Sequence, residues 1–167
     1  MKKSVFIIII VAFAVTIFLC PAYAVSPTYS STRSFIYLLD DANIKYTVYG
    51  VLDGGDECVT VSNSGDYFSY DIDYFFDSNL ENAALRVFDI ITYKDADYVN
   101  VLKTVNDLNS RYKYVKLYAD ESDNTVTADA DLIFRTHDVG EICLEATLYM
   151  AQFLDTAYKE LRIYNIA

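Results

Sequence analysis

The feature that most constrains the fold of this chain is a regular alternation of side chains between residues 67 and 76. Every second residue there is aromatic or aliphatic, namely Phe68, Tyr70, Ile72, Tyr74 and Phe76. Because successive side chains of a strand point to opposite faces, this period predicts an antiparallel strand with one buried and one solvated face. Such a strand needs other elements to cover its apolar face.

Six strands and three helices are predicted, with no linker or internal repeat between them. The strands are expected at 45–52, 58–62, 67–76, 84–93, 113–119 and 125–134. The helices are expected where apolar residues recur every three or four positions, at 30–42, 97–111 and 138–161. Short turns predict an antiparallel meander, and the amphipathic helices must cover one face of it. The predicted class is α+β, a two-layer sandwich in the order helix, four strands, helix, two strands, helix.

The first 24 residues have the pattern of an export signal. Residues 2 and 3 are lysines, an apolar stretch runs from Val5 to Leu19, and residues 22–24 form an A-x-A cleavage site. An uncleaved membrane anchor is the alternative, but the apolar stretch is shorter than the roughly 20 residues of a spanning helix. We expect a cleaved signal peptide at 1–24, a flexible N-terminus at 25–29 and one domain at 30–167. The protein would then be exported, either periplasmic or secreted, with no membrane attachment after cleavage.

The charge balance excludes two classes of partner. The chain has 13 basic and 24 acidic residues, a net charge of −11. Loss of the two N-terminal lysines leaves 11 basic residues against 24 acidic ones, a net charge of −13. Nucleic-acid binders need a basic footprint, and proteins held on anionic membranes need basic patches. A basic protein or peptide is therefore the favoured partner.

Two cysteines remain after removal of the signal. Cys58 begins a predicted strand, and Cys143 lies on the apolar face of the last predicted helix. In an oxidising compartment they can form a disulfide. Two separate buried thiols are the other interpretation, which the sequence favours because free cysteine packs as a small apolar side chain. The choice depends on the Cα separation, which the sequence does not give.

The sequence contains no clear catalytic or metal-binding motif. The one histidine, His137, is followed by Asp138, but adjacency in sequence does not provide the geometry of a catalytic base with its nucleophile and orienting carboxylate. One histidine and two cysteines also leave no metal cluster at a diagnostic spacing. Asp71 and Asp73 share one face of their predicted strand, where paired carboxylates can bind Ca²⁺ or act in hydrolysis. A charged, solvated sheet face is the simpler interpretation. We therefore expect a non-enzyme without cofactor or metal.

Residues 101–118 form the most distinctive motif of the chain. They read VLKTVNDLNSRYKYVKLY and contain N-x-L-N-x-x-Y at the end of a predicted helix. This motif, the acidic turn at 120–124 and Phe153-Leu154-Asp155 in the last helix resemble the YbjN family over about residues 30–162. The resemblance implies a fold like that of type III secretion chaperones, which often dimerise, and a role proposed for the family in sensory transduction. It carries over no catalytic residue, and the signal peptide sets this chain apart from the cytoplasmic chaperones.

The motif asparagines have a structural interpretation. Asn106 and Asn109 come late in the helix, where asparagine tolerates the left-handed conformation of a C-cap.

The candidate binding surface consists of tyrosines on neighbouring predicted strands with two carboxylates among them. It comprises Tyr46, Tyr49, Tyr67, Tyr70, Tyr74, Tyr93, Asp71 and Asp73. If the helices cover one face of the sheet, some of these tyrosines face solvent on the other. Tyrosine is common at protein interfaces, although it also fills cores and favours strands.

The favoured hypothesis is an exported, non-enzymatic homodimer that binds a protein or peptide through its sheet or a groove beside the long helix. It would act as a chaperone-like or sensory adaptor, or as an acidic neutraliser of a basic toxin. The alternatives are a carboxylate-dependent hydrolase or a Ca²⁺-binding protein built on Asp71 and Asp73, and a purely structural dimer.

Overall fold

The computed structural model describes residues 25–134 and 138–166. The predicted signal peptide and His137 lie outside the described residues. The helices are α1 (Ser30–Asp41), the short 3₁₀ helix η1 (Asp95–Asp97), α2 (Tyr98–Arg111) and α3 (Val139–Leu161). The strands are β1 (Tyr46–Val51), β2 (Glu57–Ser64), β3 (Ser69–Phe76), β4 (Asn82–Thr92), β5 (Lys116–Asp120) and β6 (Thr125–Ile133). Each predicted helix and strand is present, with ends that differ by about three residues at most.

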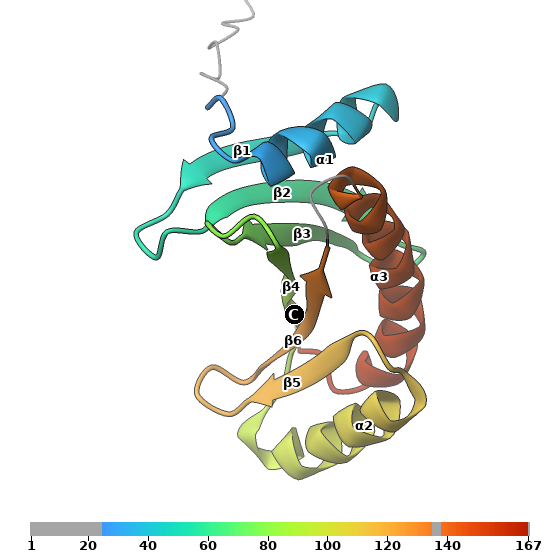
Figure 1. The fold of residues 1–167 in the computed structure, drawn as a ribbon. Helices are drawn as coiled ribbons and strands as arrows, with labels where there is room; N and C mark the ends of the chain where they lie inside the picture. Colours follow the sequence, from blue (N-terminus) through green and yellow to red (C-terminus); the bar gives the residue numbers. More distant parts are fainter. Residues whose placement is uncertain (1–24, 135–137, 167) are drawn as a thin grey trace, which may run out of the picture.

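The strands form a single antiparallel sheet in the order β1-β2-β3-β4-β6-β5. The α2 segment carries the chain past β4, so that β5 forms one outer edge of the sheet while β6 pairs with β4 inside it. Figure 1 shows the three α-helices on the same side of the curved sheet, with α3 along its middle and α2 beside β5. The predicted α+β class is confirmed. Among the described residues, no helix has the length and apolarity that a membrane span requires.

The core lies between the sheet and the helices. On β3, Tyr74 and Phe76 are fully buried, whereas Asp71 is exposed on the opposite face, as the alternation predicts. The ring of Phe35 on α1 packs 4.5 Å from that of Tyr74 and 5.9 Å from that of Phe76. Each such aromatic pair contributes about 0.5–1.5 kcal/mol beyond the area it buries. The alternation of one strand thus sets which face the helices cover.

Glu57 joins the start of α1 to β2. Its side chain is fully buried and accepts hydrogen bonds from the backbone N–H groups of Thr28 (2.6 Å) and Tyr29 (2.8 Å). Burial alone would raise the pKa of Glu57, but these hydrogen bonds outweigh it and hold the pKa below its ordinary value. The carboxylate therefore satisfies donors at the N-terminus of a helix, where a negative charge is favourable. It also ties down the last two residues of the 25–29 segment.

Asn109 explains the motif at the end of α2. Its side-chain amide donates to the Leu117 carbonyl (2.9 Å), and its side-chain oxygen accepts from the Leu117 backbone N–H (2.8 Å). The amide thus pairs with β5 as a neighbouring strand would, which corrects the expectation that Asn109 is a C-cap. The C-cap position is occupied by Tyr112 in an extended conformation. The Lys116 ammonium donates to the carbonyls of Asn109 (2.9 Å) and Tyr112 (2.7 Å), where the helix dipole favours a cation.

Candidate functional site

Three tyrosines of the predicted binding surface belong to the core. Tyr70, Tyr74 and Tyr93 are 7%, 0% and 1% exposed. Tyr70 and Tyr74 fall on the same side of β3 as the buried Ile72, so the helices cover them. The Tyr74 hydroxyl donates to the Cys143 carbonyl of α3, and the Tyr93 hydroxyl donates to the Asp120 carbonyl (2.8 Å). The expectation that these three rings face a partner is therefore corrected.

The open face of the sheet is the face that the helices do not cover, and two more of the predicted tyrosines lie away from it. Tyr46 is half-buried on the helix side and donates to Asp40 (2.9 Å); burial, and then this carboxylate, raises the pKa of Tyr46. Tyr67 lies in the turn before β3 and stacks on Tyr158 of α3. Of the six predicted tyrosines only Tyr49 projects from the open face, where it is 59% exposed.

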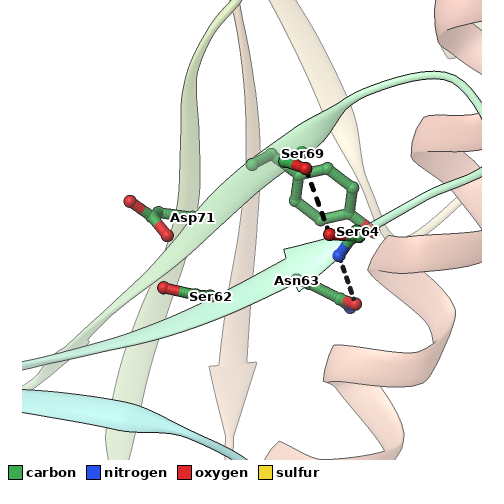
Figure 2. Close-up of a pocket in the computed structure, with 6 residues that line it drawn as sticks. Ser62, Asn63, Ser64, Ser69 and Asp71 are labelled. Atoms are coloured by element: carbon green, nitrogen blue, oxygen red, sulfur yellow. Dashed lines mark hydrogen bonds between the residues drawn. The ribbon is translucent and has the colours of Figure 1, made fainter. Parts of the chain in front are cut away.

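Asp71 and Asp73 lie together on the open face, as predicted. Asp73 accepts a short hydrogen bond from the hydroxyl of Thr60, its cross-strand neighbour on β2. Asp71 lies opposite Ser62 and borders a polar hollow of about 480 Å³ near the end of β2 and the start of β3 (Figure 2). The hydroxyls of Ser64 and Ser69 in this hollow bond to each other. Within residues 25–134 and 138–166 no three His, Cys, Asp or Glu side chains form a metal-binding group.

The two cysteines among the described residues are both buried free thiols. Cys58 lies on β2 and Cys143 on α3, where burial raises the pKa of each thiol, that of Cys58 to about 11. A buried thiol with a raised pKa is a poor nucleophile. Burial therefore favours the neutral form of both thiols.

A row of charged side chains crosses the open face. The strand registers place Asp73, Arg86, Asp129 and Lys116 side by side on four adjacent strands. The Arg86 guanidinium lies 3.7 Å from the Asp129 carboxylate and 5.6 Å from the centre of the Phe75 ring. Both cations of this charged row already have partners on the protein, because Lys116 bonds to the end of α2.

Asp129 is the unusual member of the charged row. One of its carboxylate oxygens, Oδ1, is buried and makes no hydrogen bond with the described residues. Burial raises the pKa of Asp129; Arg86 lowers it, the neighbouring Asp131 raises it, and the net direction is upward. The side chain as a whole is 21% exposed, so the carboxylate can still meet a cation at the surface and is a candidate for binding one.

A hollow lined by four carboxylates, the acidic hollow, lies beside the charged row, across β4, β5 and β6. It has a volume of about 310 Å³, and it is lined by four carboxylates, two aromatic rings and one cation, namely Asp89, Asp120, Asp123, Asp129, Phe88, Tyr118 and Arg86. Phe88 and Tyr118 are 47% and 55% exposed. A register shift in β4 between Val87 and Ile91 puts Asp89 in a left-handed conformation (φ 52°) and turns both Phe88 and Asp89 outward. Bulges of this kind often re-aim side chains at functional surfaces.

A further hollow of the open face lies on the other side of the charged row. It measures about 360 Å³ and combines Phe75 and Ile133 with the carboxylates Asp56, Asp77 and Asp131. The two hollows that flank the charged row therefore offer apolar walls and carboxylates, an arrangement that suits the long apolar stem and charged head of lysine or arginine. Cross-strand register brings these residues together, so the sequence does not place them in one site; its signals are the acidic turn at 120–124 and a polar Asp89 inside an apolar strand.

Two solved structures share this architecture. YbjN from E. coli, a proposed transcription regulator, matches with a TM-score of 0.50 and 11% identity over 75% of this chain and 90% of that one. The chain has the fold of YbjN. A chain of the ExsC–ExsE complex matches with a TM-score of 0.50 and 17% identity over 81% of this chain and 93% of that one. No family model and no curated protein matches the sequence. The YbjN resemblance of the sequence is thus confirmed at the level of the fold. A chain of a protein–protein complex has the same fold.

Proposed function

We propose that this protein is an exported, non-enzymatic binding module that holds a basic segment of a partner protein on its open sheet face. The observation that carries the proposal is the acidic hollow, in which four carboxylates lie beside the exposed aromatic rings of Phe88 and Tyr118. A lysine or arginine placed there would neutralise these carboxylates and stack on Tyr118 or Phe88. The role is that of a chaperone-like or regulatory adaptor.

Three further observations support a protein partner. The cations of the charged row are engaged within the protein, so the carboxylates give the open face an excess of negative charge. Exposed aromatic side chains on a polar surface are typical of interface anchors. A chain with the same fold takes part in the ExsC–ExsE complex. A basic toxin is one partner that this charge would fit.

A titration of the purified protein with a short arginine-rich peptide tests the proposal. Tyr118→Ala should weaken binding about tenfold, the usual cost of truncating an aromatic anchor. Tyr37→Ala is the matched control, because Tyr37 is also an exposed tyrosine (71%, against 55% for Tyr118) but lies on α1 on the other side of the sheet. Equal loss in both variants, or tight binding of an aspartate-rich peptide, would contradict the proposal.

Homodimerisation belongs to the same proposal. If the open face binds the partner, the homodimer must form through another surface. Light scattering should give twice the chain mass both with and without the arginine-rich peptide. A mass that falls to one chain on addition of the peptide would show that dimer and partner compete for the same surface.

A further inference from the structure

β6 extends beyond its neighbour on the outer side of the sheet. β5 begins at Lys116, which lies opposite Asp129, whereas β6 continues to Ile133. The backbone N–H of Phe134 donates to the Glu81 carbonyl (2.9 Å), on the side of β4. Because backbone groups alternate in an antiparallel ladder, those of Asp131 and Ile133 point the other way. In the register of the described strands, no strand pairs with this part of β6, and an unpaired edge is a template for another strand.

An apolar groove of about 410 Å³ lies directly beside this edge, on the helix side of the sheet. Its lining includes Leu132 of β6, Ile142, Tyr149 and Met150 of α3, and Tyr114 and Val115, where the chain turns away from the sheet. Tyr114 is 74% exposed and packs edge-on against Tyr149, with 5.8 Å between the ring centres. Residues 114 and 115 turn away from the sheet and leave space beside residues 131–133 of β6. A strand added in line with β5 would fill this space.

The charges around the groove select the occupant. Asp131 on the edge and Glu145 on α3 also line the groove, and both are exposed. A segment with basic side chains would neutralise them, whereas a second copy of this chain would bring the same carboxylates of both copies together. Charge complementarity therefore favours a basic partner over self-association.

We infer that the Asp131–Ile133 edge and the adjoining groove form a docking site for an extended segment of a partner protein, in which apolar residues alternate with lysine or arginine. The segment pairs with β6 as an added strand. Its apolar side chains enter the groove beside Met150 and Tyr149, and its basic ones point to the opposite side of the sheet, toward Asp131. Backbone pairing gives affinity, and the pocket for alternate side chains gives specificity. This site is separate from the acidic hollow and does not rest on the function proposed for the open face.

The test is an NMR titration of the isotope-labelled protein with a synthetic peptide that alternates lysine with valine and leucine. We expect the amide signals of Asp131 and Ile133 to shift and to gain protection from hydrogen exchange. Ile133→Pro should weaken binding at least tenfold, about the worth of one lost backbone hydrogen bond, because it removes an edge N–H that pairing with β4 does not use. Ile133→Ala, the matched control, keeps that N–H and should bind as the native protein does.

A second variant guards against a folding defect at position 133. Ala146 of α3 also lines the groove, and Ala146→Trp, which fills it, should weaken binding to a similar extent, while Tyr37→Ala on α1, outside both sites, should have no effect. The inference is overturned if the shifts map to Tyr118 and Asp129 and leave Asp131 and Ile133 unchanged, if Ile133→Pro with native-like spectra binds normally, or if a peptide alternating glutamate with the same apolar residues binds equally well. The first of these outcomes would leave the proposed open-face function intact.

Discussion

At the scale of single residues, Glu57 and Asp129 show how the surroundings of a carboxylate decide its role. Glu57 is fully buried, yet two backbone N–H groups satisfy it and its pKa lies below the ordinary value. Asp129 keeps an unsatisfied buried oxygen and its pKa lies above the ordinary value. The first carboxylate stabilises the fold, and the second lowers its stability. Functional sites commonly carry such a cost.

Replacement of Asp129 by asparagine should therefore raise the unfolding temperature at neutral pH. A raised carboxyl pKa in the folded state means that stability is lost as the pH rises from the ordinary value of 3.8 through the folded pKa. The Asp129→Asn variant should lose this pH dependence and match the native protein below pH 3.8. Asp71→Asn, an exposed change on the same face, is the control. Thermal unfolding across pH measures both, and a lower melting temperature for Asp129→Asn at neutral pH contradicts the account.

Replacement of Glu57 by glutamine should act in the opposite direction. A lowered pKa means that Glu57 stabilises the fold above its ordinary value of 4.5, and that this contribution is lost as the pH falls through the folded pKa. Glu57→Gln should lower the free energy of unfolding at neutral pH by about 1–3 kcal/mol, since one charged acceptor is removed from buried donors. Denaturant titrations at a series of pH values should show that the free energy of unfolding falls less steeply with acidification in the variant than in the native protein. An equally steep fall in both would show that Glu57 does not carry this pH dependence.

At the scale of elements, hydrophobic periodicity predicts the helices and strands because each element buries one face. It also places Tyr70 and Tyr74 on the same face of β3 as Ile72, so their burial follows from the alternation of side chains along this strand. Other features depend on contacts that periodicity does not contain. The outward turn of Phe88 and Asp89 comes from the bulge in β4, and the position of Tyr67 comes from stacking on Tyr158, far along the chain. The acidic hollow, formed across three strands, could not be predicted for that reason.

The packing of α1 against α3 depends on Gly140. A Cβ atom at this position would lie 2.8 Å from Leu38 Cδ1 and 2.9 Å from the Ser34 carbonyl oxygen. Alanine normally stabilises a helix interior by about 1 kcal/mol relative to glycine. Here the Ser34 backbone cannot move without displacing α1, so we expect Gly140→Ala to lower the free energy of unfolding by about 1–3 kcal/mol. Chemical denaturation measures the sign, and a stabilised variant would contradict the close helix contact.

At the scale of the whole molecule, pairing between distant strands creates the open face. The chain pairs β4 with β6 and leaves β5 at the edge, which puts Arg86 beside Asp129 and Asp129 beside Lys116. The order of strands rests on long-range pairing that local sequence does not determine, whereas the net charge of −11 is evident from composition. The fold class was therefore predictable, and the arrangement of charges and aromatic rings on the open face was not.

The overall charge predicts a strong dependence of partner binding on salt. Exposed charges separated by more than about 8 Å are largely screened at physiological ionic strength. Raising the salt concentration should therefore slow association with a basic peptide far more than it speeds dissociation. Stopped-flow association rates at increasing salt measure this, and a rate that does not change would assign recognition to apolar contacts alone.

The central claim is that the open face binds a basic partner protein, and photo-crosslinking in the source cell tests it most directly. A photoreactive amino acid replaces Tyr118 in one variant and Tyr37 in the other, both in the full-length protein. We predict a single crosslinked partner from position 118, with its contact site in a segment rich in lysine or arginine, and none of that partner from position 37. The same partner from both positions, or an acidic contact segment at position 118, would contradict the claim.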